Sequence, residues 1–134
     1  ARYGHKDYAL QVMSALFDAS NLVDFHRLPE LFCGFRRAPG RNPTIYPMSC
    51  APQAWAAGSI FMLLGACLGI KIKAESNELV LYHPRIPSYL DSVTIRNLQV
   101  AGGSMVDINF TNHGHDVSVD ILKRLGDSRI TVVK

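Results

Sequence analysis

The sequence predicts an α+β fold in which two long helices precede an antiparallel β-domain. The first half holds two stretches long enough for helices, and proline occurs in them only near one end. The second half holds a series of short segments rich in β-branched residues. Helices and strands are segregated along the chain rather than alternating, which is typical of α+β folds or of two domains. With 134 residues, 48% of them hydrophobic, the chain can form one modest core.

The first helix is predicted from about residue 5 to residue 22. Apolar residues recur there at approximately the helical period, and no proline or glycine interrupts them. These residues are Tyr8, Leu10, Val12, Met13, Leu16 and Phe17. Asp18, Ser20 and Asn21 weaken the pattern, so the helix is expected to end near them.

The following segment, residues 24–49, is predicted to be a long irregular loop. It contains four prolines and two glycines, namely Pro29, Pro39, Pro43, Pro47, Gly34 and Gly40. A loop of this length in a compact domain is commonly functional or disordered. Its aromatic residues Phe25, Phe32, Phe35 and Tyr46 are of a type that disordered linkers avoid, which favours a functional loop.

The second helix is predicted to begin with Ser49 or Cys50 as N-cap, to hold Pro52 in its first turn, and to end near Leu68 with Gly69 as the stop. Residues 54–70 carry no charge. The stretch is about as short as a membrane-spanning helix can be. A helix that is apolar on every face is more often buried in a large protein, so we expect a buried helix and no membrane span.

The second half is predicted to form short antiparallel strands. Residues 71–74 and 78–82 flank a turn at 75–77, which indicates a hairpin. Further strands are expected at 93–96, 105–110, 117–121 and 130–133, separated by turns rich in glycine and asparagine. The predicted domains are therefore residues 1–70 and residues 71–134.

Composition argues against several classes of function. The net charge of +3 is small, and the basic residues are scattered, so no nucleic-acid partner is expected. Three cysteines without a C-x-x-C spacing indicate reduced thiols and a cytoplasmic protein. The first residues do not resemble a signal peptide, and the start at Ala1 is typical of a fragment or a processed product.

No metal or organic cofactor is expected. His113 and His115 flank Gly114 at a predicted hairpin tip, and Asp116 alone does not complete a ligand set. The sequence Asn109-Phe110-Thr111 matches a glycosylation sequon, which a cytoplasmic protein would not use.

Two motifs carry a resemblance to a known family. RLPELFCGF, residues 27–35, is followed by YPMSCAPQAW, residues 46–55, and then by the β-rich half. This combination resembles the C-terminal end of the amylo-α-1,6-glucosidase domain of bacterial and archaeal glycogen debranching enzymes. The resemblance implies that residues 1–70 are the last two helices of an (α/α)6 barrel, that 24–49 is an active-site loop, and that residues 71–134 form the accessory β-domain.

Glu30 has two interpretations. From spacing alone it is a solvated loop carboxylate between a proline and an aromatic cluster. The resemblance implies instead that Glu30 is the general base of an inverting glycosidase, which activates a water molecule on a branched α-glucan. The general acid would lie in the rest of the parent barrel, outside this chain, so the chain alone is expected to be inactive.

Other candidate substrate-binding residues also keep two interpretations. Tyr46 and Trp55 either stack on a glucose ring or pack in the core. Gln53 either contacts a sugar hydroxyl or the attacking water, or caps neighbouring backbone. Arg27 and Arg36 either contact the sugar or pair with acids and solvent.

Two further functions remain open. In the first, the chain is a non-catalytic assembly module, in which the apolar helix at residues 52–68 is the interface of a homo-oligomer. The parent is alternatively another (α/α)6 glucosidase or a disaccharide phosphorylase, and phosphate dependence of its activity would separate these from a debranching hydrolase.

Overall fold

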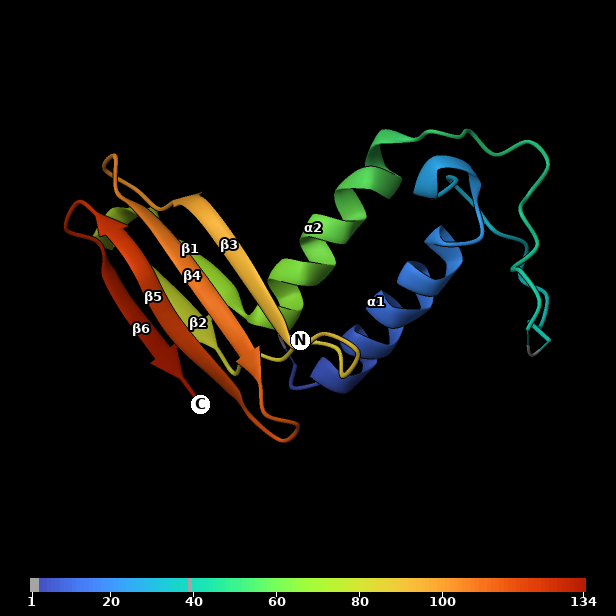
Figure 1. The fold of residues 1–134 in the computed structure, drawn as a ribbon. Coiled ribbons are helices and arrows are strands. Elements are labelled where there is room, and N and C mark those ends of the chain that lie inside the picture. The colour runs from blue at the N-terminus through green and yellow to red at the C-terminus, as the bar shows by residue number, and fades with distance from the viewer. Residues whose placement is uncertain (1–2, 39) are drawn as a thin grey trace. The chain divides into compact units, whose positions relative to one another are not determined.

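The computed structural model describes residues 3–38 and 40–134, which form two compact units (Figure 1). One unit comprises residues 3–10 and 65–134, and the other comprises residues 11–64. The described residues contain two α-helices, α1 (Lys6–Ser20) and α2 (Ala54–Leu68), and six strands that follow them. The predicted α+β class, with two helices before the strands, is confirmed.

The unit of residues 11–64 has a small apolar core. Ala19, Leu28 and Ala56 are buried there, and Leu16, Phe32 and Ile60 pack against them. Between the helices the described residues, 21–38 and 40–53, are irregular, as predicted, apart from a short 3-10 turn η1 (Asp24–His26) and one β-bridge between Phe32 and Ile45. The core therefore anchors one end of a long loop, and most of the loop remains exposed.

The predicted start of the second helix is wrong. Helix α2 begins at Ala54, so Ser49 and Cys50 are not its N-cap, and Pro52 precedes it. The carbonyl of Gln53 accepts the Ala57 N–H at 3.1 Å. The reason for the later start is a tertiary one, because both backbone polar groups of Cys50 are already bonded to Glu30.

The predicted end of α2 is confirmed. The helix ends at Leu68, and Gly69 follows with a φ of 67°. A Cβ atom added at Gly69 would lie 2.0 Å from the carbonyl oxygen of Tyr82. Both the left-handed backbone and the close approach require glycine at this position.

One side of α2 is exposed in this chain, whereas the apolar sequence predicts a helix buried within a larger protein. Trp55, Phe61 and Met62 are 66%, 77% and 69% exposed, respectively. Trp55 therefore does not pack in a core of this chain. Among the described residues, we find no helix with both the length and the apolarity needed to span a bilayer.

The strands form two three-stranded sheets. The sheet orders are β1-β2-β6 and β3-β4-β5. The strand bounds are β1 (Ile70–Lys73), β2 (Glu78–Tyr82), β3 (Ser92–Gln99), β4 (Met105–Asn112), β5 (Val117–Leu125) and β6 (Arg129–Val133), and a 3-10 turn η2 (Ala74–Ser76) joins β1 to β2. The predicted hairpin is confirmed, and the predicted domain boundary at residues 70/71 falls inside β1.

The core of the β-half follows from the two-residue period of its strands. Val106, Ile108 and Phe110 alternate along β4 and are 0% exposed, as are Leu79 and Leu81 of β2. The alternating residues of β4 thus form one apolar face, and the two sheets bury their apolar residues in a sandwich-like arrangement. The central strand of each sheet supplies most of this core.

The expectation of a wholly antiparallel β-domain is wrong for the last strand. β6 pairs with β2 in parallel, from Glu78 opposite Arg129 to Tyr82 opposite Val133. The strand after β5 does not fold back into a hairpin with it but joins the other sheet. Glu78 reinforces this sheet, because its carboxylate accepts bonds from Lys73 on β1 at 2.7 Å and from Thr131 on β6 at 2.9 Å.

Lys6, at the start of α1, is a buried anchor within the same unit as the sandwich. Its ammonium group donates to the carbonyls of Cys67, Tyr82 and His83 at 3.0, 2.5 and 2.6 Å. Burial lowers the pKa of Lys6 below its ordinary value. The Cys67 carbonyl also accepts the Arg85 N–H at 2.9 Å, so the same oxygen accepts hydrogen bonds from both Lys6 and Arg85.

Candidate functional site

Glu30 and Cys50 join the two sequence motifs directly. The Glu30 N–H donates to the Cys50 carbonyl at 2.9 Å, and the Cys50 N–H donates back to the Glu30 Oε2 at 3.2 Å. Twenty residues separate these positions in the sequence. The segments 27–35 and 46–55, chosen from the sequence alone, therefore lie side by side.

The local fold positions the Glu30 carboxylate at the edge of the small core. Leu28 and Pro29 are buried immediately before it, whereas Glu30 itself is partly exposed. After it, the β-bridge between Phe32 and Ile45 holds the chain, together with the hydrogen bond from the Cys33 N–H to the Thr44 carbonyl at 2.7 Å. Glu30 is thus held from both sides by ordered backbone while its carboxylate remains accessible to water.

A cavity of about 430 Å³ lies next to these motifs in the same unit. It is lined by Val23, Asp24, Phe25, Arg27, Pro29, Ile45, Tyr46, Pro47, Ser49, Ala51 and Pro52. Two of the predicted substrate-binding residues, Arg27 and Tyr46, are therefore brought together. The volume is within the range of small-molecule pockets.

The cavity wall offers both apolar and polar contacts. The Arg27 guanidinium carbon lies 5.4 Å from the centroid of the Phe25 ring, a cation–π distance. The Ser49 hydroxyl is buried and has no hydrogen-bond partner among the described residues. A hydroxyl left in this state favours a polar ligand or a water molecule at the cavity wall.

The other predicted site residues do not line this cavity. The Gln53 side chain accepts the Ala54 N–H at 2.9 Å, which is the capping interpretation of this residue. Trp55 is exposed on α2, and Arg36 is exposed in the loop. Glu30 borders the cavity through its neighbour Pro29 but does not line it.

Glu30 presents a partly exposed carboxylate with one backbone hydrogen-bond donor. Its carboxylate accepts one backbone N–H, and within the described residues no hydrogen bond or ion pair joins it to another side chain. Asp24 is the carboxylate that lines the cavity. Within residues 3–38 and 40–134 no three metal-ligating side chains are grouped, and all three cysteines are free thiols.

Sequence reasoning missed the parts of the site that depend on backbone. The contribution of Cys50 is its N–H and carbonyl, which any residue except proline provides, so the sequence gives no signal for it. Phe25, at a φ of 55°, places its ring beneath Arg27, and no motif marks that conformation. Only the short spacing of Phe25 and Arg27 in the sequence indicates that their side chains could meet.

Comparisons of the chain with protein families, with curated proteins and with solved structures find no match. The functional conclusion therefore rests on the two motifs and on the geometry that surrounds them.

Proposed function

We propose that this chain is the C-terminal part of a glucosidase of the bacterial glycogen debranching type, which hydrolyses α-1,6-glucosidic branches with inversion. In this proposal residues 1–70 supply two helices and the active-site loop of an (α/α)6 barrel, and residues 71–134 are an accessory β-domain. The substrate is a branched α-glucan, the parent is cytoplasmic, and no metal or organic cofactor takes part.

The observation that carries the proposal is the mutual pair of hydrogen bonds between Glu30 and Cys50. The resemblance depends on two motifs, and a coincidental match would give no reason for them to meet. A second support is the exposed apolar side of α2, at Trp55, Phe61 and Met62. Exposed patches of this kind mark surfaces that a partner covers, as neighbouring barrel helices would cover this one.

Glu30 acts as the general base in this mechanism. Its ionised carboxylate takes a proton from a water molecule, which attacks the anomeric carbon from the face opposite the leaving oxygen. A carboxylic acid elsewhere in the parent protonates that oxygen. The Cys50 N–H fixes one carboxylate oxygen, Oε2, and leaves Oε1 for the water. Tyr46 and Arg27 would contact the sugar from the cavity wall.

The decisive experiment measures glucose release from a branched limit dextrin by the full-length parent and by its Glu30→Gln variant. Glutamine keeps the size of the side chain but cannot accept the proton. General acid–base groups contribute about 10²–10⁴-fold, so a loss of that size in kcat with KM nearly unchanged is expected. Glu75→Gln is the matched control, because Glu75 is exposed in η2 and makes the same chemical change. Activity within twofold of wild type for both variants would remove Glu30 from the mechanism.

The exposed side of α2 also supports a second candidate, a non-catalytic assembly module. In that case the 134-residue chain associates with itself through α2, and saccharides do not alter the association. Analytical ultracentrifugation of the chain and of Phe61→Glu tests this candidate. Concentration-dependent dimers that Phe61→Glu abolishes would favour assembly, and monomers in both samples would count against it.

A further inference from the structure

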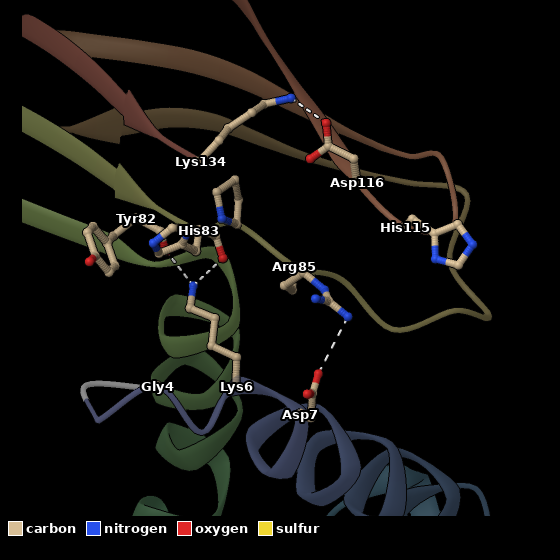
Figure 2. A pocket seen from close by; sticks show the side chains of 10 residues that line it. Gly4, Lys6, Asp7, Tyr82, His83, Arg85, His115, Asp116 and Lys134 are labelled. Atoms are coloured by element: carbon tan, nitrogen blue, oxygen red, sulfur yellow. Dashed lines mark hydrogen bonds and ion pairs between the residues drawn. The ribbon is translucent and has the colours of Figure 1, made fainter.

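A second cavity of about 430 Å³ lies wholly within the unit of residues 3–10 and 65–134 (Figure 2). Five segments meet there: the start of α1, the end of β2, the segment after it, the β4–β5 turn and the end of β6. The lining residues are Gly4, Lys6, Asp7, Tyr82, His83, Pro84, Arg85, His115, Asp116 and Lys134. Half of them carry basic side chains, so the cavity differs in character from the one beside Glu30.

Lys6 is the least exposed cation of this cavity, and within the part of the chain that the structure describes no carboxylate forms an ion pair with it. Lys6 is 9% exposed, and the three hydrogen bonds of its ammonium group all go to neutral backbone carbonyls. These bonds hold the group in place but leave its positive charge uncompensated. An anion in the cavity would gain from this field, because a buried charge is poorly screened by solvent.

Arg85 and Lys134 are the cations at the rim, and each forms an exposed ion pair with a carboxylate of the lining. Figure 2 shows Arg85 directed toward Asp7 and Lys134 toward Asp116. The Arg85 guanidinium lies 3.5 Å from the Asp7 carboxylate, whose side chain is 78% exposed. Ion pairs this exposed contribute little, so a doubly charged ligand can compete for the guanidinium.

The backbone of Arg85 is fixed even though its side chain is free to exchange partners. Its N–H donates to the Cys67 carbonyl, the same oxygen that accepts from Lys6. His83 and His115 add ring nitrogens to the lining. Among the lining side chains, the three cations Lys6, Arg85 and Lys134 outnumber the two carboxylates of Asp7 and Asp116, so these side chains contribute a net positive charge.

We propose that this cavity binds the phosphate group of a small phosphate monoester. A guanidinium fork, a lysine point charge and imidazole donors together suit a tetrahedral dianion better than a single carboxylate. The volume is within the range that holds a whole small molecule, and therefore leaves room for the ester group. The proposal does not depend on the proposed glucosidase function, because no lining residue belongs to the unit of residues 11–64 that holds Glu30 and its motifs.

The test is a titration of the 134-residue chain, followed by ¹H–¹⁵N chemical-shift changes, with inorganic phosphate, glycerol 3-phosphate, malonate and chloride at matched ionic strength. Phosphate and glycerol 3-phosphate should shift the amides of Arg85, His115 and Asp116 in a saturable way. Tighter binding of glycerol 3-phosphate identifies a monoester as the ligand. Equal binding of the two phosphates would restrict recognition to the phosphoryl group and overturn the monoester assignment. Equal shifts with malonate or chloride would overturn the proposal altogether.

Variants then locate the site. Arg85→Gln should weaken phosphate binding about tenfold or more, because a charge-assisted hydrogen bond is lost. Arg96→Gln makes the same change on β3 outside the cavity and should bind as wild type does. Lys134→Gln, at the rim, gives an independent second variant should Arg85→Gln fold poorly. Equal weakening by Arg85→Gln and Arg96→Gln would indicate nonspecific charge attraction and reject the site.

Discussion

Lys6→Met should destabilise the chain more than any other single loss of charge. Methionine keeps the length and apolar stem of lysine but removes all three hydrogen bonds of the ammonium group. The Cys67 carbonyl keeps the Arg85 N–H as donor. The carbonyls of Tyr82 and His83 each lose a part-buried donor, and a buried polar group left unsatisfied costs about 1–3 kcal/mol.

One term offsets this loss. The lowered pKa of Lys6 has burial as its largest cause, which means that the folded state already bears a cost for enclosing the ammonium. Methionine removes that cost. The expected net decrease in the free energy of unfolding is therefore about 2–3 kcal/mol, which corresponds to a decrease in Tm of roughly 10 °C for a chain of this size.

The assay is urea and thermal unfolding followed by circular dichroism, with Lys123→Met as the control. Lys123 is exposed on β5, so its variant should differ from wild type by less than about 0.5 kcal/mol. A Lys6→Met variant as stable as Lys123→Met would refute the anchoring role. The pH dependence gives a second readout: as pH rises past the lowered pKa, folded Lys6 releases its proton before the unfolded chain does, so wild-type stability should rise toward the ordinary lysine pKa. Lys6→Met should lack this rise.

Three further predictions concern the fold. Gly69→Ala should lower the free energy of unfolding by roughly 3 kcal/mol or more, because it places a Cβ atom against the Tyr82 carbonyl at a positive φ. Gly65→Ala, in open space within α2, should raise the free energy of unfolding by about 0.5–1 kcal/mol. The urea midpoints of the two variants should shift in opposite directions, and shifts of the same sign would contradict this prediction. Phe110→Ala should lower the free energy of unfolding by about 3–5 kcal/mol, because Phe110 is fully buried. Phe61→Ala, on the exposed side of α2, should change the free energy of unfolding of the monomer by less than about 0.5 kcal/mol. Equal effects of the two variants in thermal unfolding would show that Phe110 does not lie in the sandwich core. The hydrogen bonds from Lys73 and Thr131 lower the pKa of Glu78. The stabilising effect of the Glu78 carboxylate is therefore present above the ordinary glutamate pKa and is lost as pH falls through the lowered pKa. Glu78→Gln should show a smaller decrease of Tm in acid than wild type does, and an unchanged slope of Tm against pH would argue against these bonds.

Local sequence signals predicted the elements that local interactions determine. The end of α2 at Gly69 and the β1–β2 hairpin depend on residues close together in sequence, and both are confirmed. The start of α2 was misplaced because residues 49–52 have capping chemistry that suits a helix, but Cys50 bonds to Glu30 instead. Long-range pairing overrode the local propensity.

The direction of β6 and the walls of the cavities could not be predicted for a related reason. The sequence of residues 130–133 predicts a strand whether its partner is β5 or β2. The alternation of apolar and polar residues indicates which face of a strand is buried, but not which strand lies beside it. The cavity at Lys6 needs five segments that are distant in sequence. The sequence identified the Glu30 motif and its companion segment, but the contact between them appears only in the fold.

The parallel pairing of β2 with β6 has a consequence for how the chain folds. Roughly 50 residues separate the paired positions Glu78 and Arg129, and such non-local contacts slow folding because a long loop must close first. The β1–β2 hairpin is only marginally stable by itself. During synthesis, β2 therefore presents an open edge until β6 emerges, and self-association of unfinished chains would begin at this strand.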